Sequence, residues 1–269
     1  MNRVVVRIAV NVFKESVRDK VLYNLVFFAV MMIATSYLIG QLTAGQDVKI
    51  IKDLGLAATS IFGLFIAVFI GIGLVSKEVE RRSIYGLLAK PIRRRDFILG
   101  KYLGLVLTLL VNVGVMTLAV YAVLGYMSLM AGTWQMPSWE RPAVDPLLLK
   151  AIALTFLQLM IVTAVALFFS TFSTPMLSAA LTFGLYVVGH FNADLRNFEN
   201  VIESRPVVYL ARGLYYLLPN LAPLDVKQQV VHGLPVSWQY IGLNTAYAVV
   251  YIAAVLVAAG FIFSRRDFK

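Results

Sequence analysis

The sequence has no cysteine, only two histidines and few charged residues, which make up 14% of its 269 positions. Without cysteine, the chain can form no disulfide, no thiol nucleophile and no thiolate metal site. Two histidines far apart in the chain also argue against a histidine-based metal site. Soluble domains carry about 25% charged residues, whereas 60% of this chain is apolar. We therefore expect the lipid bilayer to be the solvent for most of the chain.

Long apolar segments predict six membrane-spanning helices in one all-α transmembrane domain over residues 1–269. A helix that crosses about 30 Å of hydrocarbon needs roughly 20 mostly apolar residues. The run from Ala151 to Ala193 carries no charge and is long enough for two crossings. Pro175 separates these two, because proline lacks the backbone donor that a helix interior needs. The expected spans are residues 21–40, 54–75, 102–127, 151–170, 176–193 and 241–263.

Positive charge gathers on one side of these spans. The segment 1–20, the loop 76–101 and the C-terminal tail hold two thirds of the 24 Lys and Arg residues. Lys and Arg of short loops accumulate in the cytoplasm. An even number of spans then predicts a multi-pass protein of the cell (cytoplasmic or inner) membrane with both termini cytoplasmic. The net charge of +10 does not predict nucleic-acid binding, because the charges lie between apolar runs rather than on a soluble face.

The segment 1–20 predicts an amphipathic helix that lies on the membrane surface. A basic helix of this kind binds anionic lipids at the cytoplasmic face. It is expected either to anchor and orient the first span or to contact a specific partner. The polar stripe consists of Arg3, Arg7, Asn11, Lys14 and Arg18, and the apolar stripe of Val6, Val10, Phe13 and Val17.

The longest connection, residues 194–240, lies on the opposite side of the expected membrane. Its aromatic residues include Tyr209, Tyr215, Tyr216 and Trp238, and such amphipathic rings settle at the membrane–water interface. The segment is expected to be either an interfacial connection or a lid over an exit path.

The expected spans contain no Asp, Glu, Lys or Arg. Ion-coupled carriers and intramembrane enzymes place ionisable groups at membrane depth, so the sequence argues against both. His190, near the outer end of the fifth span, is expected to be an interfacial or packing residue. Asn112, Gln158 and Asn244 are expected either to join helices by hydrogen bonds or to line a polar translocation path.

The loop 76–101 has more order than a loop that only sets topology would need. Ser83 suits the N-cap of a short helix. Ile84, Leu87 and Leu88 then share one helical face, and Pro91 ends the helix. A short helix with an apolar face on a charged loop is expected to dock, either on the membrane surface or in a groove of a soluble partner.

This ordered loop resembles the stretch between the second and third spans of ABC-2 type transporter permeases. The six-span layout, the Leu218-Pro219-Asn220-Leu221 sequence before the last span and the C-terminal Ser264–Phe268 extend the resemblance. Ser83 departs from the commoner threonine. The matching residues of the loop are Glu78, Glu80, Arg82, Ser83, Ile84, Leu87, Leu88, Pro91, Arg93, Phe97, Gly100 and Lys101.

The resemblance implies a permease subunit that is paired with a second permease copy, identical or paralogous, and with two ABC ATPase subunits. Residues 83–88 would be the coupling helix that docks into the ATPase, with Glu78 or Glu80 pairing with Arg82 or Arg93 to stiffen the loop. The chain itself has no phosphate-binding GxxxxGK[ST] loop. ATP and Mg²⁺ are therefore expected on the partner ATPase, with no cofactor on this chain and no enzymatic activity in it.

Two other functions fit the sequence. A membrane scaffold or assembly subunit that does not transport would share this topology. A membrane-embedded enzyme would need a site in the outer segment, around His190, Asp194, Glu199 and Glu203. The sequence does not indicate the substrate or the direction of transport.

Overall fold

The computed structural model describes residues 3–42, 47–80, 94–130, 144–191, 213, 215 and 218–265, and the long elements of these ranges are all α-helices. This confirms the predicted all-α class. The described elements are α1 (Arg3–Val17), α2 (Lys20–Gln41), α3 (Asp47–Glu80), α5 (Arg94–Met130), α6 (Leu147–Ser170), α7 (Pro175–His190), the 3-10 helix η2 (Ala222–Leu224), α10 (Lys227–Val231) and α11 (Trp238–Arg265).

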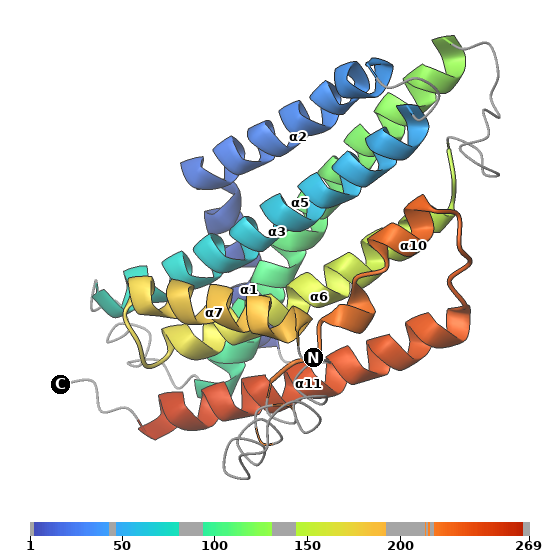
Figure 1. The fold of residues 1–269 in the computed structure, drawn as a ribbon. Helices are drawn as coiled ribbons and strands as arrows, with labels where there is room; N and C mark the ends of the chain where they lie inside the picture. The colour runs from blue at the N-terminus through green and yellow to red at the C-terminus, as the bar shows by residue number, and fades with distance from the viewer. Residues whose placement is uncertain are drawn as a thin grey trace.

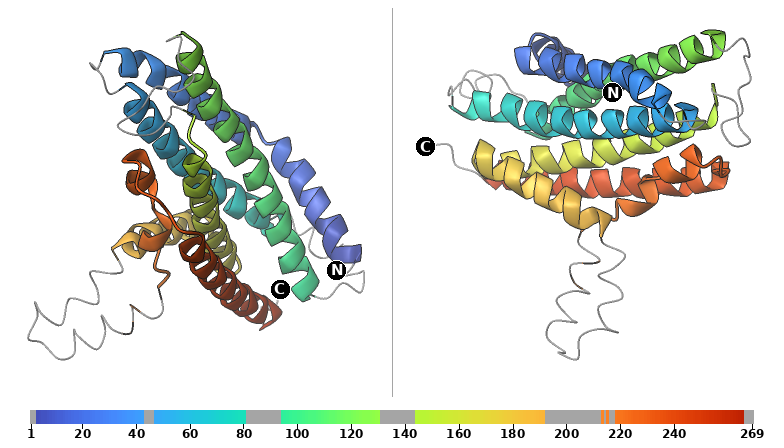
Figure 2. Two further views of the ribbon diagram at one scale, coloured as in Figure 1. Left: turned by 90° about the vertical axis from the view of Figure 1, so that its right-hand side faces the viewer. Right: turned by 45° about the horizontal axis from the view of Figure 1, so that its top comes forward.

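The helices form a bundle around α3 and α6 (Figures 1 and 2). Helix α3 packs against α2, α5, α6 and α7, and α6 packs in addition against α5, α7 and α11. We compare the most apolar 18-residue stretch of each helix. Of this stretch, 72% is buried in α3 and 67% in α6, but only 22% in α2 and 33% in α11. The centre of the bundle is therefore α3 and α6, while α2 and α11 lie at its periphery and expose apolar side chains.

Within the described residues, five helices are long and apolar enough to cross a membrane: residues 20–41, 48–73, 95–130, 147–170 and 238–263. They correspond to five of the predicted spans. The sixth, predicted at 176–193, corresponds to α7, which has only 16 residues and ends at His190. At 1.5 Å per residue it is about 24 Å long, which is less than the hydrocarbon thickness.

The helices around the predicted loop 76–101 extend beyond the apolar spans. Helix α3 continues to Glu80, and α5 already begins at Arg94. Charged residues such as Glu, Lys and Arg are good helix formers, so a helix need not end where its apolar segment ends. The part of the loop that lies outside the described residues is therefore limited to 81–93.

The turn predicted at Pro175 is confirmed. Helix α6 ends at Ser170, and α7 begins at Pro175 itself, where the missing N–H of proline leaves no donor unpaired. Ser173 Oγ lies 2.6 Å from Ser178 Oγ and joins the turn to the first turn of α7. In Figure 1, this turn lies at the same end of the bundle as the last turns of α3 and α11.

Helix α1 packs against the beginning of α5. Close contact is possible there because Gly100 and Gly104 of α5 have no side chains. A Cβ at Gly104 would lie 2.6 Å from the carbonyl oxygen of Ala9, and one at Gly100 would lie 2.7 Å from Ile8 Cβ. Val12 is buried in this contact. Glycines four residues apart let two helix backbones approach closely.

Only part of the predicted apolar stripe of α1 is exposed, because Phe13 and Val17 are half-buried. Val6 and Val10 are each 39% exposed, whereas Val5, Val12 and Ser16 are buried. Helix α1 therefore has three faces: the packed face, the exposed apolar stripe and the basic stripe. The exposed apolar stripe is free to contact lipid, so the structure adds an internal contact to the predicted surface helix.

Candidate functional site

Half of the predicted docking loop, residues 81–93, lies outside the described residues. Arg82, Ser83, Ile84, Leu87, Leu88, Pro91 and Arg93 belong to that undescribed part, and Glu78 and Glu80 are described only as backbone of the last turns of α3. The coupling helix and the proposed ion pairs therefore stay predictions. The structure does show the helices between which the loop is held.

These framing helices are well packed. Helices α3 and α5, which carry the two ends of the loop, contact each other. Close to the start of α5, Phe97 stacks on Phe263 of α11 with ring centroids 5.8 Å apart. Lys101 Nζ lies 4.9 Å from the centre of the Phe97 ring. The first turns of α5, at the base of the loop, thus belong to a helix that contacts α1, α3 and α11.

The polar residues predicted to line a path differ in their contacts. Asn112 Nδ2 donates to Thr108 O at 2.6 Å, and Asn244 Nδ2 donates to Tyr240 O at 2.9 Å. Each amide therefore bonds to a carbonyl of its own helix. In the part of the chain that the structure describes, Asn112, Gln158 and Asn244 share no hydrogen bond with one another. A continuous path through these three residues stays a prediction.

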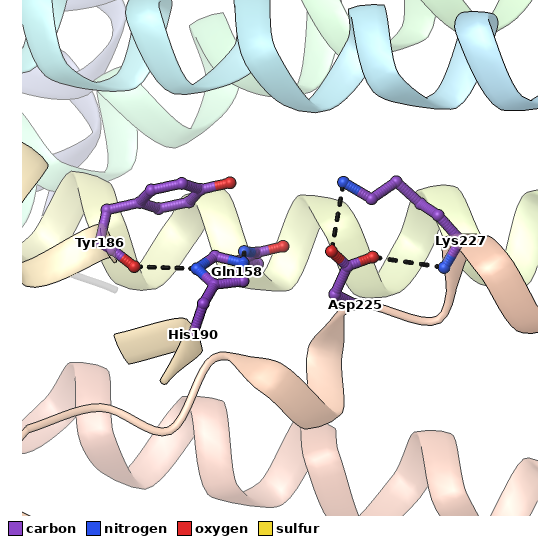
Figure 3. A network of polar contacts seen from close by, with 5 residues as sticks. All are labelled: Gln158, Tyr186, His190, Asp225 and Lys227. Atoms are coloured by element: carbon purple, nitrogen blue, oxygen red, sulfur yellow. Dashed lines mark hydrogen bonds and ion pairs between the residues drawn. The ribbon is translucent and has the colours of Figure 1, made fainter. Parts of the chain in front are cut away.

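Gln158 instead joins α6 to α7 (Figure 3). Its Nε2 lies 2.8 Å from His190 Nε2, and His190 Nδ1 lies 2.8 Å from the carbonyl oxygen of Tyr186. The rings of Tyr186 and His190 are in contact, with centroids 4.5 Å apart. His190 was predicted to be an interfacial or packing residue, and in the structure each of its ring nitrogens takes part in a hydrogen bond.

Other polar side chains surround this pair. Ser60 of α3 and Gln158 are neighbours of the Tyr186 hydroxyl, and Asp225 lies farther along α6 (Figure 3). Asp225 precedes α10 and forms an ion pair with Lys227, whose Nζ is 3.3 Å from Oδ2. We call the six residues Ser60, Gln158, Tyr186, His190, Asp225 and Lys227 the polar cluster. Figure 3 shows five of them around the middle of α6.

Asp225 and Lys227 belong to the polar cluster because residues 218–231 fold back onto the bundle. Leu221 N donates to Gly189 O at 2.9 Å, and a Cβ at Gly189 would lie 2.9 Å from Pro219 O. Helix α10 packs against α3 and α6. The buried residues of the segment are Leu221, Leu224, Val226, Val230 and Val231.

Hydrogen bonds to α11 and α6 hold the folded-back segment from its other side. Tyr240 Oη donates to Pro223 O at 2.7 Å, and Asn220 N donates to Tyr247 Oη at 2.8 Å. Lys150 Nζ donates to Val236 O at 2.7 Å and lies 4.5 Å from the Trp238 ring centre. In its described part, the predicted outer loop 194–240 is therefore packed protein rather than a loose connection.

Sequence reasoning missed most of the polar cluster. Asp225 and Lys227 lie in a segment read as a loop, and Ser60 and Tyr186 were not singled out. A signal was present in Pro219 and Pro223, which break up a short apolar stretch just before the last span. Within the described residues, no group of three or more His, Asp or Glu could hold a metal ion.

A comparison with protein families accounts for this architecture. The family model described as ABC-2 family transporter protein matches residues 6–268. A search of curated protein sequences finds no match. The family match covers nearly the whole chain and agrees with several apolar helices of spanning length, which identify a multi-pass membrane protein. The chain therefore belongs to the ABC-2 transporter family, as the resemblance of its loop 76–101 predicted.

Proposed function

We propose that this chain is the permease subunit of an ATP-driven transporter, and that a separate ATPase docks on the loop between α3 and α5. The observation that carries the proposal is the family match over residues 6–268. The family implies an ABC ATPase as partner and a dimeric assembly of permeases. The cargo crosses or leaves the membrane between the two permease copies.

The packing of the framing helices supports a mechanical role for the loop. Helix α3 passes the polar cluster at Ser60 and continues to Glu80, where the loop follows, so one helix connects the two regions. Helix α5 carries the other end of the loop and is clamped to α1 at Gly100 and Gly104. Closure of the ATPase dimer would push the loop, and these helices would carry the movement into the bundle.

The proposed function also implies which parts of the chain lie on each side of the membrane. Both termini and the loop 81–93 lie in the cytoplasm, where the ATPase binds ATP and Mg²⁺. Residues 218–231 then approach the bundle from the opposite side and cover its outer end, in the position of a lid. This chain supplies no catalytic group to ATP hydrolysis in the proposal.

Replacing Leu87 by Glu tests the docking step. The charge would be placed on the apolar face of the coupling helix, where desolvating an unpaired carboxylate is costly. We expect the ATPase to be lost from the complex purified in mild detergent, while membrane insertion is unchanged. Leu42→Glu is a matched control, because it places the same charge on a leucine that lies at the C-terminal end of α2 and is 87% exposed.

Two results would contradict the proposal. Unchanged co-purification of the ATPase with Leu87→Glu would exclude docking through this face. Complete absence of an ATPase from complexes of the unaltered chain would instead favour a scaffold or assembly subunit that does not transport.

A further inference from the structure

Helix α1, together with the residue that follows it, repeats one order of faces along its length. In residues 5–7, 12–14 and 16–18, the first position is buried, the second is apolar and at least partly exposed, and the third is an exposed cation. Successive residues of a helix lie about 100° apart around its axis. The packed face, the exposed apolar stripe and the basic stripe therefore run side by side, in this order, along the whole helix.

The contact with α5 fixes the direction in which these faces point. An added Cβ at Gly100 would lie 3.1 Å from Val5 O, and one at Gly104 would lie 2.6 Å from Ala9 O. These neighbours are backbone atoms on successive turns of α1, so the two helices run in the same direction with their backbones in close contact. Because α5 covers the packed face, the other two stripes form the outer side of α1.

The basic stripe has no acidic partner. Its four cations are exposed, and none of them forms an ion pair within the part of the chain that the structure describes. Glu15 lies beyond the stripe, one position farther around the helix than the last lysine, and Asp19 accepts a hydrogen bond from the first turn of α2. The cations extend over about 22 Å of helix and are Arg3, Arg7, Lys14 and Arg18.

Charge, rather than hydrophobicity, determines what this outer side binds. In the apolar stripe, Val6 and Val10 are each 39% exposed, and Phe13 and Val17 are half-buried, so little apolar surface remains to be covered. Each Lys or Arg near an anionic membrane surface, by contrast, strengthens binding about fivefold. Four cations therefore contribute more than two partly exposed valines.

We propose that the outer side of α1 binds the headgroups of anionic phospholipids, and that it concentrates these lipids beside the first turns of α5. A membrane surface presents phosphate groups and acyl chains in adjacent layers, which matches a basic stripe that runs beside an apolar one. An acidic soluble protein would match only the basic stripe. The inference rests on the proposed function for one point, the cytoplasmic side of the membrane on which α1 lies.

Lipid-specific quenching tests the proposal. Because the chain has no cysteine, Val10→Cys places a single thiol for a fluorophore on the exposed apolar stripe. The purified full chain is placed in vesicles of phosphatidylcholine and phosphatidylglycerol in equal amounts, and the acyl chains of one lipid or the other carry bromine, which quenches the fluorophore on contact. We expect brominated phosphatidylglycerol to quench several-fold more strongly than brominated phosphatidylcholine.

A second labelling position gives the reference for bulk lipid. Leu118 is 72% exposed on α5, about 21 Å along that helix from Gly104. A fluorophore on Leu118→Cys should be quenched equally by the two brominated lipids. Both leaflets of the vesicles contain both lipids, so the direction in which the chain inserts does not affect the comparison.

Two single substitutions test whether the preference comes from the basic stripe. Arg7→Gln removes one of its cations and should lower the preference at the Val10 position by up to about fivefold. Arg95→Gln is the matched control, because Arg95 is an exposed cation of α5 that lies five residues before Gly100 and about 140° around the helix from it. This control should leave the preference unchanged.

Salt provides a test that needs no change in the stripe. At about 1 M salt the screening length falls to about 3 Å, so the preference at the Val10 position should largely disappear. A preference that persists at this salt concentration would overturn the proposal.

Two other results would also overturn it. Equal quenching by the two brominated lipids at the Val10 position would assign the basic stripe to a protein partner instead of lipid. Equal losses of preference with Arg7→Gln and Arg95→Gln would show that the stripe is not the source. None of these measurements includes an ATPase, so their outcome is independent of the docking step that Leu87→Glu tests.

Discussion

The contact between α1 and α5 gives the sharpest prediction about the described structure. At Gly104, an added Cβ would lie 2.6 Å from Ala9 O and 2.6 Å from Val12 Cβ. Ordinary contact begins at 3.4 Å, so α1 would have to move by about 0.8 Å even for alanine. The obstacle is backbone of α1, which cannot rotate away as a side chain can. Gly104→Leu should therefore displace α1 from α5.

The size of the effect follows from the cost of overpacking, about 1–3 kcal/mol. Because every 1.4 kcal/mol is tenfold in an equilibrium constant, the undocked population of α1 should rise by about 5- to 150-fold. Gly114→Leu is the matched control, because Gly114 lies on the same helix and an added Cβ there meets nothing within 4 Å.

The absence of cysteine provides the assay. A single Val12→Cys places a thiol in the contact, where Val12 is 4% exposed, and a single Val10→Cys places one on the exposed stripe. Maleimide should label the Val12 position slowly in the parent and faster, by the factor above, with Gly104→Leu. The Val10 position should label at one rate throughout. Slow labelling at Val12 in Gly104→Leu would refute the close packing of α1 on α5.

Two smaller predictions concern helix ends. Gly189→Ala should lower the thermal unfolding temperature in detergent, because the added Cβ would lie 2.9 Å from Pro219 O and push residues 218–224 outward. Gly184→Ala is the control and should leave this temperature unchanged, because its Cβ meets nothing within 4 Å. Equal effects of the two substitutions would contradict the contact at Gly189. Asp19→Ala removes the side-chain oxygen that caps α2 and should lower the unfolding free energy by about 1 kcal/mol. An unchanged midpoint in a denaturant titration would contradict this role of Asp19.

The spans could be predicted from the sequence because each is encoded locally. A helix inside a bilayer must satisfy its own backbone groups and bury apolar side chains, so length and hydropathy suffice to find it. The first expected span, 21–40, and the observed α2, Lys20–Gln41, differ by one residue at either end. Pro175 likewise acts through its own backbone, and the turn was predicted for that reason.

The polar cluster and the α1 contact could not be predicted, because both depend on residues far apart in the sequence. The periodicity of residues 3–18 shows one apolar stripe, but the packed face is defined by Gly100 and Gly104 of another helix. Leu221 approaches the end of α7 closely because residue 189 is a glycine. The docking residues of loop 76–101 stay a prediction that rests on the family.

The shortness of α7 has a consequence for the surrounding lipid. Its 16 residues span about 24 Å, some 6 Å less than a typical hydrocarbon core, and it exposes Met176, Leu181 and Val187 along its length. Acyl chains beside α7 would have to shorten or disorder to match its length. Acyl chains beside α11 would instead contact an apolar helix of 26 residues. A protein that presents helices of such different length to lipid favours a thinner bilayer beside the shorter helix. A thinner membrane should relieve this mismatch, so the lipid chain length itself becomes a variable that sets how readily α7 and its neighbours move.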